Sequence, residues 1–342
     1  MIDFRYHVVS IVAIFLALTV GLVIGASILS KGVADSLRSD LSQRNDQIKS
    51  QQNQINQLKT QIEQQNKYIT DTADQLVSGR LSGLCVALVE IAGADSDAYS
   101  GARTLLSKQA GGTICSETTI NASLSSAASS DQQQSMATLV TAHTPTGQKL
   151  TGTTAQQSME LIGEALTTYQ TSTSAKTTTG TTVTNGTTGT NGTTVTSGMT
   201  ASQALSTLKD FQSDGFITML TQPVTGEQAS LAYVQAPGSA NADADNQTYI
   251  ALAEALRKGG AGTVVGGSGD SAAKGGLVYA IINDSTATRE ISTVDNTDVT
   301  MGRVSAVFCL EAESQSSDSA AGHYGTGANN DGLLPPIATG SG

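Results

Sequence analysis

Residues 8–29 read VVSIVAIFLALTVGLVIGASIL and contain no charged side chain. At ~1.5 Å of rise per residue, a helix of this length spans about 33 Å, which is enough to cross the hydrocarbon core of a bilayer. This stretch decides the architecture, because it fixes one end of the chain to a membrane. We interpret residues 1–30 as a short tail followed by a retained transmembrane helix.

A cleaved signal peptide and a buried core helix are the alternatives for this stretch. Signal peptides have apolar segments of roughly 7–15 residues, although Gly25-Ala26-Ser27 resembles a cleavage site. A core helix of a soluble domain has a polar face, and this segment is apolar on all sides. Arg5 precedes the span and Lys31 and Arg38 follow it, so charge does not decide the orientation. The short leading tail favours a cytoplasmic N-terminus and an extracytoplasmic main domain, in a single-pass protein of the cell membrane.

Small residues recur every four positions within the span, at Ala13, Ala17, Gly21 and Gly25. Such ridges, including the GxxxG pair, let two membrane helices approach closely. The ridge therefore predicts helix packing in the membrane. The alternative is that Gly and Ala are simply common in membrane helices.

A heptad pattern follows in residues 33–78, which are otherwise rich in Gln, Asn, Asp, Lys and Ser. One apolar residue recurs at every seventh position: Ala34, Leu41, Ile48, Ile55, Ile62, Ile69 and Leu76. The complementary d positions are mostly polar: Leu37 and Leu58 are apolar, but Arg44, Gln51, Gln65 and Thr72 are not. Isoleucine at a positions favours a parallel two-stranded coiled coil, and polar layers weaken it. We expect either a parallel homodimer or a helix that binds a coiled-coil partner of the envelope.

Residues 81–316 predict an α/β domain with a mostly parallel, Rossmann-like sheet, because short apolar runs alternate with helical patterns. The predicted strands are Leu84–Ile91, a strand that begins at Thr113–Cys115, Phe216–Leu220, Leu231–Gln235, Thr263–Val265 and Glu290–Val294. The predicted helices are Ala98–Ala110, Asp131–Val140, Ala155–Thr168, Ala201–Phe211, Asp245–Lys258, Ser271–Ile282 and Asp298–Glu311.

Two segments of this region have a composition typical of unordered chain. Residues 171–200 form a Thr/Gly/Asn tract that buries too little apolar surface to order itself, so we expect a disordered insertion. Residues 317–342 form a Gly-rich tail. The formal net charge of −11 argues against nucleic acid as a partner.

The motifs of common cofactor sites are missing from the sequence. Ala92-Gly93-Ala94-Asp95 follows the first strand in place of GxGxxG, and the glycine-rich run at 262–269 has no Walker pattern. We therefore predict no cofactor-binding residue. Cys85 and Cys115 lie in neighbouring predicted strands; they are either small core residues or, in an oxidising compartment, a disulfide. A metal site built from them is a third reading, and Cys309 fits a core position.

Histidines and acidic residues supply no defensible catalytic set. His7, His143 and His323 are far apart in the sequence, so no Ser-His-Asp order emerges. Four acidic residues lie where strand ends meet their loops, which is where α/β domains bind ligands: Asp95, Asp97, Asp295 and Asp298. Acidic caps are also common at such positions, and we predict no catalytic residue.

Several motifs together resemble the actinobacterial copper transport protein B (MctB) family. They are the opening MIDFRYH of residues 1–7, the segment 15–18 with the GxxxG pair, residues 292–296, and residues 322–327. The order of anchor, coil, α/β domain and tail also matches, whereas the Thr-rich insertion departs from the family pattern. The resemblance implies copper efflux and channel formation in the mycobacterial envelope, with some relatives acting in cell division. It carries no catalytic residues, and copper is implied by it alone.

We therefore favour a membrane-anchored interaction protein that assembles through its coiled coil and is not an enzyme. A single apolar helix has no polar face to line a pore, and the strands are too few for a transmembrane barrel. Copper efflux or homeostasis is the first alternative, and an enzyme that acts on an envelope polymer is the second.

Overall fold

The computed structural model describes residues 4–168, 198–223, 229–315, 321–327 and 330–336; the side chains of residues 4–5, 27–32 and 34 are excluded. The chain forms two compact units, Met1–Gln65 and Asn66–Gly342. Helix α1 (Phe4–Val77) makes up the described part of the first unit and ends within the second. Its segment Tyr6–Ala26 has a mean hydropathy of 2.8 and is long and apolar enough to cross a membrane. This agrees with the predicted transmembrane helix over the residues whose side chains are described.

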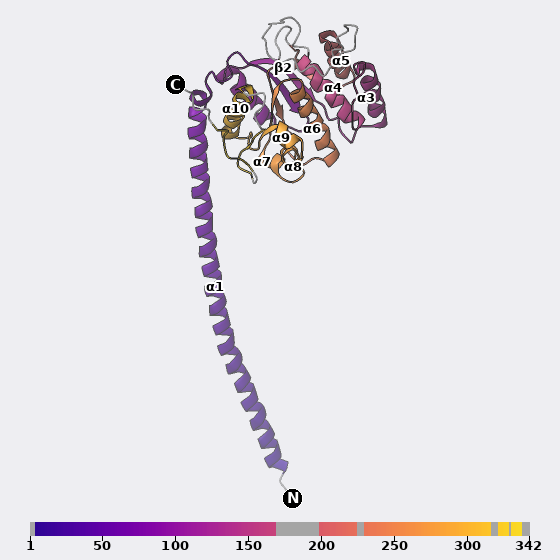
Figure 1. Ribbon diagram of the computed structural model, residues 1–342. Coiled ribbons are helices and arrows are strands. Elements are labelled where there is room, and N and C mark those ends of the chain that lie inside the picture. Colours follow the sequence, from indigo (N-terminus) through magenta and orange to yellow (C-terminus); the bar gives the residue numbers. More distant parts are fainter. Residues whose placement is uncertain (1–3, 169–197, 224–228, 316–320, 328–329, 337–342) are drawn as a thin grey trace, which may run out of the picture. The chain divides into compact units, whose positions relative to one another are not determined.

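The second unit is built on a seven-stranded mixed sheet with the order β3-β2-β1-β4-β5-β6-β7 (Figure 1). The strands are β1 (Cys85–Ile91), β2 (Thr113–Ile120), β3 (Ile217–Thr221), β4 (Leu231–Gln235), β5 (Gly262–Gly266), β6 (Ser292–Val294) and β7 (His323–Tyr324). The edge strand β3 pairs antiparallel with β2, and every other pair is parallel. The predicted mostly parallel sheet is confirmed.

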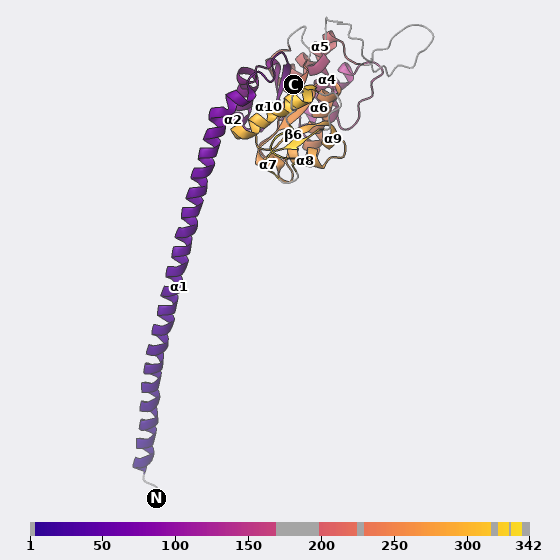
Figure 2. The ribbon, with the colours of Figure 1, turned by 60° about the vertical axis from the view of Figure 1, so that its left-hand side comes forward.

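Helices cover both faces of the sheet. They are α2 (Ser96–Thr104), the π-helical turn η1 (Leu105–Gln109), α3 (Ser130–His143), α4 (Thr154–Thr168), α5 (Ala201–Ser213), α6 (Asp243–Lys258), α7 (Gly269–Ala272), α8 (Leu277–Asn283), α9 (Ala287–Glu290) and α10 (Thr300–Gln315). Helix α10 lies on one side of the sheet and α4 and α6 on the other (Figure 1), and α2 lies beside α10 (Figure 2).

Two apolar cores result, because successive side chains of a strand point to opposite faces. Along β1, Ala87 and Val89 face the larger core, which α3 to α6 and α8 complete. Val86 and Leu88 face the smaller core, which contains side chains of α2, η1, α10 and the end of α1. Burial of Cys85–Val89 on both faces of the sheet explains why these five residues form an unbroken apolar run.

Some predicted elements differ from the structure. The predicted helix Ser271–Ile282 is two helices, α7 and α8, because the chain turns at Gly275, whose φ is +93°. The predicted strand Glu290–Val294 begins later, since Glu290 ends α9. The strand predicted to begin at Thr113–Cys115 does begin there, and β2 runs on to Ile120.

Two other segments bear on the predicted boundaries. Strand β7 lies within the predicted Gly-rich tail 317–342. Most of the predicted disordered insertion 171–200 lies outside the described residues. Its end is described: Met199 is buried, and the Thr200 side chain caps α5 by accepting a hydrogen bond from the Gln203 N–H.

Candidate functional site

The predicted seam forms an exposed apolar series along α1. Leu41, Ile48, Ile55, Leu58 and Ile62 are each between 46% and 60% exposed. Polar side chains separate them, so the helix offers a narrow apolar stripe of the kind that coiled coils bury. Leu37 is exposed as well, and the Ala34 side chain lies outside the described part of the chain. The structure contains one copy of the chain, so pairing stays a prediction.

The last turns of α1 pack within the second unit, through a different pair of residues than the seam predicts. Ala73 is 2% exposed and Val77 is fully buried, and both belong to the smaller core with Leu81. The predicted seam residue Leu76 is 45% exposed, whereas Ile69 is half-buried. The stripe that the domain covers is therefore the i, i+4 pair Ala73 and Val77. Sequence reasoning missed this pair, although its helical spacing was the available signal.

Polar contacts reinforce this end of the helix. Arg80 Nη1 lies 2.6 Å from Glu311 Oε2, and its guanidinium carbon lies 4.0 Å from the ring centroid of Phe308. Arg80 Nε also donates to the Leu76 carbonyl oxygen at 2.7 Å, which satisfies one of the free carbonyls at the helix end. The end of α1 is thus clamped to α10 by charge, stacking and apolar burial together.

The predicted membrane ridge is open in the described part of α1. A side-chain carbon built at Gly21 or Gly25 would meet no atom within 4 Å, and Ala13 and Ala17 are exposed. The four residues are therefore available to pack against another helix.

Acidic residues at the carboxyl ends of the strands serve the structure. The Asp95 carboxylate accepts a hydrogen bond from the Ala98 N–H at 2.8 Å and so caps α2. Next to it, the Gly238 N–H donates to the Gly93 carbonyl at 2.9 Å, which links the loops that follow β4 and β1. These two loops meet where α/β sheets usually leave a ligand crevice, at the reversal of strand order.

Asp295, in the second acidic pair, also has a structural role. Asp295 is 1% exposed, and its carboxylate accepts hydrogen bonds from Thr326 N–H at 2.8 Å, Gly327 N–H at 2.6 Å and Asn330 Nδ2 at 2.6 Å. It therefore anchors the segment that follows β7. Asp97 and Asp298 contribute backbone carbonyls, which accept from Ser100 Oγ and Arg303 Nη2.

The cysteines and histidines are used individually. Cys85 and Cys115 form a disulfide, and Cys309 is a free thiol with 1% exposure, so the disulfide reading of the sequence is the one the structure has. His323 is buried between Thr288 and Thr293, and His143 Nε2 lies 3.0 Å from Asp210 Oδ2. Among the described residues, no three His, Cys, Asp or Glu side chains come together as a metal site.

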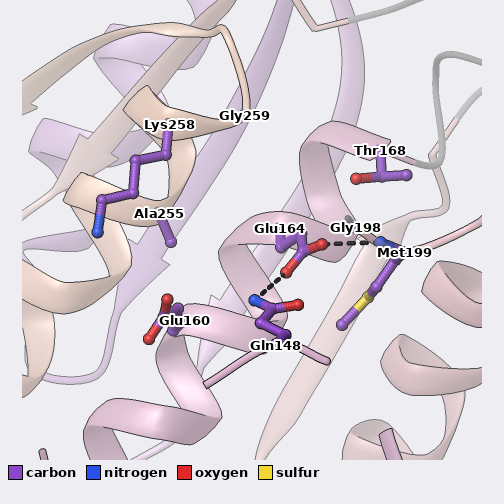
Figure 3. Close-up of a pocket in the computed structure, with 9 residues that line it drawn as sticks. All are labelled: Gln148, Glu160, Glu164, Thr168, Gly198, Met199, Ala255, Lys258 and Gly259. Carbon is purple, nitrogen blue, oxygen red and sulfur yellow. Dashed lines mark hydrogen bonds between the residues drawn. The ribbon is translucent and has the colours of Figure 1, made fainter. Parts of the chain in front are cut away.

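A cavity of about 380 Å³ lies where α4 and α6 pack (Figure 3). Its lining has polar side chains, Gln148, Glu160, Glu164, Thr168 and Lys258, beside Met199, Ala255 and two glycines. The Glu164 carboxylate is fixed, since it accepts hydrogen bonds from Met199 N–H at 2.8 Å and from Gln148 Nε2 at 2.9 Å. Burial raises the pKa of the Glu160 carboxyl; Lys258 opposes this increase and Glu164 adds to it. Sequence reasoning missed this site, because its residues come from four separate segments.

Comparison with known proteins places the chain among copper transport proteins. A family model described as "Copper transport outer membrane protein, MctB" matches residues 1–335. The chain is 26% identical to the copper transporter MctB of Mycobacterium tuberculosis (strain H37Rv) over 332 residues, which cover 96% of this chain and 97% of that protein. It is 27% identical to the copper transporter MctB of Mycobacterium leprae over 334 residues, with the same coverage. Because the family model spans nearly its whole length, this chain belongs to the MctB family.

Proposed function

We propose that this chain is a membrane-anchored protein of the cell envelope that acts by assembly through α1 and not by catalysis. The exposed apolar series on α1 is the observation that carries the proposal. Fully burying a Leu or Ile side chain contributes roughly 1.5–3 kcal/mol, so five such residues supply a substantial driving force. Polar layers at Arg44, Gln51 and Gln65 reduce it and restrict the register. We favour a second copy of this chain, in parallel orientation, as the partner that packs against the apolar series on α1. A helix of another envelope protein is the alternative.

The topology of the proposal is a single pass with a cytoplasmic N-terminus and an extracytoplasmic α/β domain. The Cys85–Cys115 disulfide supports the extracytoplasmic placement of the α/β domain, because stable disulfides are typical of oxidising compartments. A parallel pair also follows from the anchor, since two copies that enter the same membrane point their helices the same way.

Cysteine cross-linking of the full-length protein in membranes tests the pairing. Ile55→Cys lies in the seam, and Asn53→Cys, two residues earlier, lies on the opposite face of the helix. Under mild oxidation we expect Ile55→Cys to form a disulfide-linked dimer and Asn53→Cys to remain monomeric. Cys309 does not interfere because it is buried. Equal cross-linking of the two variants, or none with either, contradicts the homodimer.

A companion experiment distinguishes pairing with a second copy from binding of a partner helix. Ile55→Asp with Ile62→Asp introduces charge into the seam, and Asn53→Asp with Thr60→Asp adds the same charge outside it. If the chain pairs with itself, the first variant sediments as a smaller species in detergent and the second does not. If both retain the wild-type size while the first alone loses biological function, a partner helix occupies the seam.

Copper efflux or homeostasis is the second candidate, supported by the family description and by the names of the relatives. Copper is then cargo. The donor chemistry of the described residues argues for an indirect role: two of the three cysteines are in the disulfide, and burial raises the pKa of the Cys309 thiol, which keeps it protonated. A deletion strain with unchanged copper content and tolerance removes this candidate.

A third candidate is an enzyme that acts on an envelope polymer at the sheet edge. The strand order β3-β2-β1-β4-β5-β6 supports a Rossmann-like scaffold. In such scaffolds, ligands usually bind where the strand order reverses, which is between β1 and β4 here. The linked loops at this point, and the structural use of Asp95 and Asp295, favour a scaffold without catalysis. A folded Asp95→Asn variant with full biological activity removes the enzyme candidate.

A further inference from the structure

We propose that the last turns of α1 bind a second copy of this chain through a face formed by Tyr68, Thr72 and Leu76. This inference rests on the proposed pairing through α1 and extends the pairing surface into the second unit, which begins at Asn66. Successive residues of an α-helix are turned by about 100° around its axis, so residues 66–77 divide into three faces. Their contacts and charges differ from face to face.

The first face belongs to the apolar core of the second unit. Ala73 and Val77 are buried in the smaller core, and Ile69, one turn earlier, is half-buried. The spacing of these three residues by four places them on one side of the helix. Beside them, Thr70 Oγ1 lies 3.0 Å from Thr300 Oγ1, so this side also contacts the start of α10. This face is therefore occupied within a single copy.

The second face is charged and open to solvent. It carries Lys67, Asp71 and Asp74, which are all the charged residues of 66–77, and each is exposed. Lys67 Nζ lies 2.9 Å from Asp71 Oδ2, one turn along the same side. A helix that packs on a soluble domain needs only these two faces, an apolar one toward the core and a polar one toward solvent.

The third face is also open to solvent, but it carries no charge. Tyr68 is 71% exposed and Leu76 is 45% exposed, which makes Leu76 as open as Ile55, at 46%, in the apolar series. Thr72 lies between them, and its hydroxyl donates to the Tyr68 carbonyl oxygen at 2.8 Å, so it needs no other acceptor. Covering this face with a partner removes apolar surface from water and leaves no charge unpaired.

A second copy is the partner that fits this face, for two reasons. The first is continuity: Leu76 follows Ile62 by two heptads, so a copy that packs on the apolar series reaches Leu76 in the same register. The second is charge. The chain carries a net charge of −11, so two copies repel each other where charged surfaces meet and approach most easily through an uncharged face. The second unit is therefore part of the pairing surface.

Cysteine cross-linking of the full-length protein in membranes tests the position of this face. Leu76→Cys lies on it, and Asp74→Cys, two residues earlier, lies on the charged face. Under mild oxidation we expect Leu76→Cys to form a disulfide-linked dimer and Asp74→Cys to remain monomeric. Ile55→Cys, measured in the same membranes, reports separately on the proposed pairing along the first unit.

Sedimentation of the purified protein in detergent measures the strength of the contact. Leu76→Asp should raise the dissociation constant of the dimer about tenfold or more, because it removes a buried leucine and places two carboxylates opposite each other. Ser78→Asp adds the same charge just beyond the helix on the charged side, and it should change this constant by less than about twofold. Leu76 is exposed in a single copy, so the circular dichroism of both variants should match that of the wild type.

Three outcomes overturn the inference. One is a dimer of Ile55→Cys without a dimer of Leu76→Cys, which leaves the proposed pairing intact but ends it before the second unit. Another is equal cross-linking of Leu76→Cys and Asp74→Cys, which identifies random collision. The last is a Leu76→Asp protein that keeps the wild-type dissociation constant; if it also loses biological function, another protein covers the face. Absence of dimers from both Ile55→Cys and Leu76→Cys refutes the proposed pairing as well.

Discussion

Cys85 and Cys115 join the first two strands of the sheet by a disulfide, with their Cα atoms 5.6 Å apart. The register of β1 against β2 shifts between Val86 and Ala87, and Cys115 is the additional residue of β2 at this bulge. The bulge places Cys115 on the face of the larger core that Cys85 occupies. A local irregularity of the ladder thus brings two sulfurs together on one face.

Removal of the disulfide should destabilise the second unit by about 3–4 kcal/mol, the entropic cost of a closed loop of this length. The two cysteines are 30 residues apart in sequence. Cys85→Ala with Cys115→Ala, measured by urea unfolding, tests this value.

Labelling of the wild type from cells with a thiol-reactive polymer tests the compartment. After denaturation without reduction, the polymer should modify Cys309 alone, because Cys85 and Cys115 are joined in the disulfide. After denaturation with reduction, it should modify all three cysteines. A shift at all three cysteines without reduction would contradict the extracytoplasmic placement.

Loss of the Glu313 carboxylate should be costly, because it connects three elements. Glu313 is 3% exposed at its side chain; Oε2 lies 2.6 Å from Arg257 Nη1, and Oε1 accepts from Ser292 Oγ at 2.6 Å. Glu313→Ala leaves the Arg257 guanidinium without its partner and should lower the free energy of unfolding by roughly 3 kcal/mol. This value is at the lower end of the range for buried ion pairs, because the Arg257 side chain still reaches solvent. Glu313→Gln should recover part of it through the Ser292 hydrogen bond.

The matched control for this prediction is the exposed pair Lys67 and Asp71 on α1, which are 2.9 Å apart with both side chains more than half exposed. Asp71→Ala should change the free energy of unfolding by only about 0–0.5 kcal/mol. Similar losses for Glu313→Ala and Asp71→Ala would show that burial does not govern the strength of these ion pairs.

The elements that the sequence predicts well are those with a local signal. Leu231–Gln235 has four apolar residues in succession before Gln235, and its predicted bounds are those of β4. Strand β7 carries no such signal: it has two residues, and its pairing partner β6 lies about thirty residues earlier. The role of Asp295 was missed for the same reason, since its three donors are 31 to 35 residues away. Long-range polar contacts leave no periodic trace in a single sequence.

Asp295→Asn should release Thr326, Gly327 and Asn330 from the sheet edge. The carboxylate accepts three hydrogen bonds, and an amide can accept fewer and places donors where the Thr326 and Gly327 N–H groups point. We expect a loss of about 2–3 kcal/mol and faster proteolysis near these residues. Asp298→Asn is the control, because Arg303 contacts its backbone carbonyl. Equal protease resistance of the wild type and Asp295→Asn would refute the anchoring role.

His323 should make the second unit less stable in acid. Burial lowers the pKa of His323 below its ordinary value of 6.5, and the Thr288 hydrogen bond and the Asp331 charge oppose this effect. The unfolded chain then binds the proton more tightly than the folded protein. The stabilising contribution of neutral His323 to the folded state is therefore complete above about pH 6.5 and is lost as the pH falls below this value.

A comparison of melting temperatures at about pH 7.5 and about pH 5.5 tests this sign. Other groups also titrate in this range, so the informative quantity is the difference between the wild type and His323→Gln. The glutamine amide can donate to the Thr288 carbonyl, as His323 Nε2 does at 3.0 Å, without titrating. The variant should lose less stability on acidification than the wild type. His7→Gln, at an exposed position on α1, should behave as the wild type does.

Gly163 sets the distance between α4 and α6, beside the cavity. A side-chain carbon built there would lie 2.6 Å from the Ala255 Cβ and 3.1 Å from the Leu252 carbonyl oxygen. Gly163→Ala therefore forces the helices apart and should cost about 1–3 kcal/mol, even though alanine favours the helix itself. Adding Ala255→Gly removes the nearer obstacle and should restore part of the loss, measured by urea unfolding of the single and double variants. Additive losses would show that the two positions do not compete for the same space.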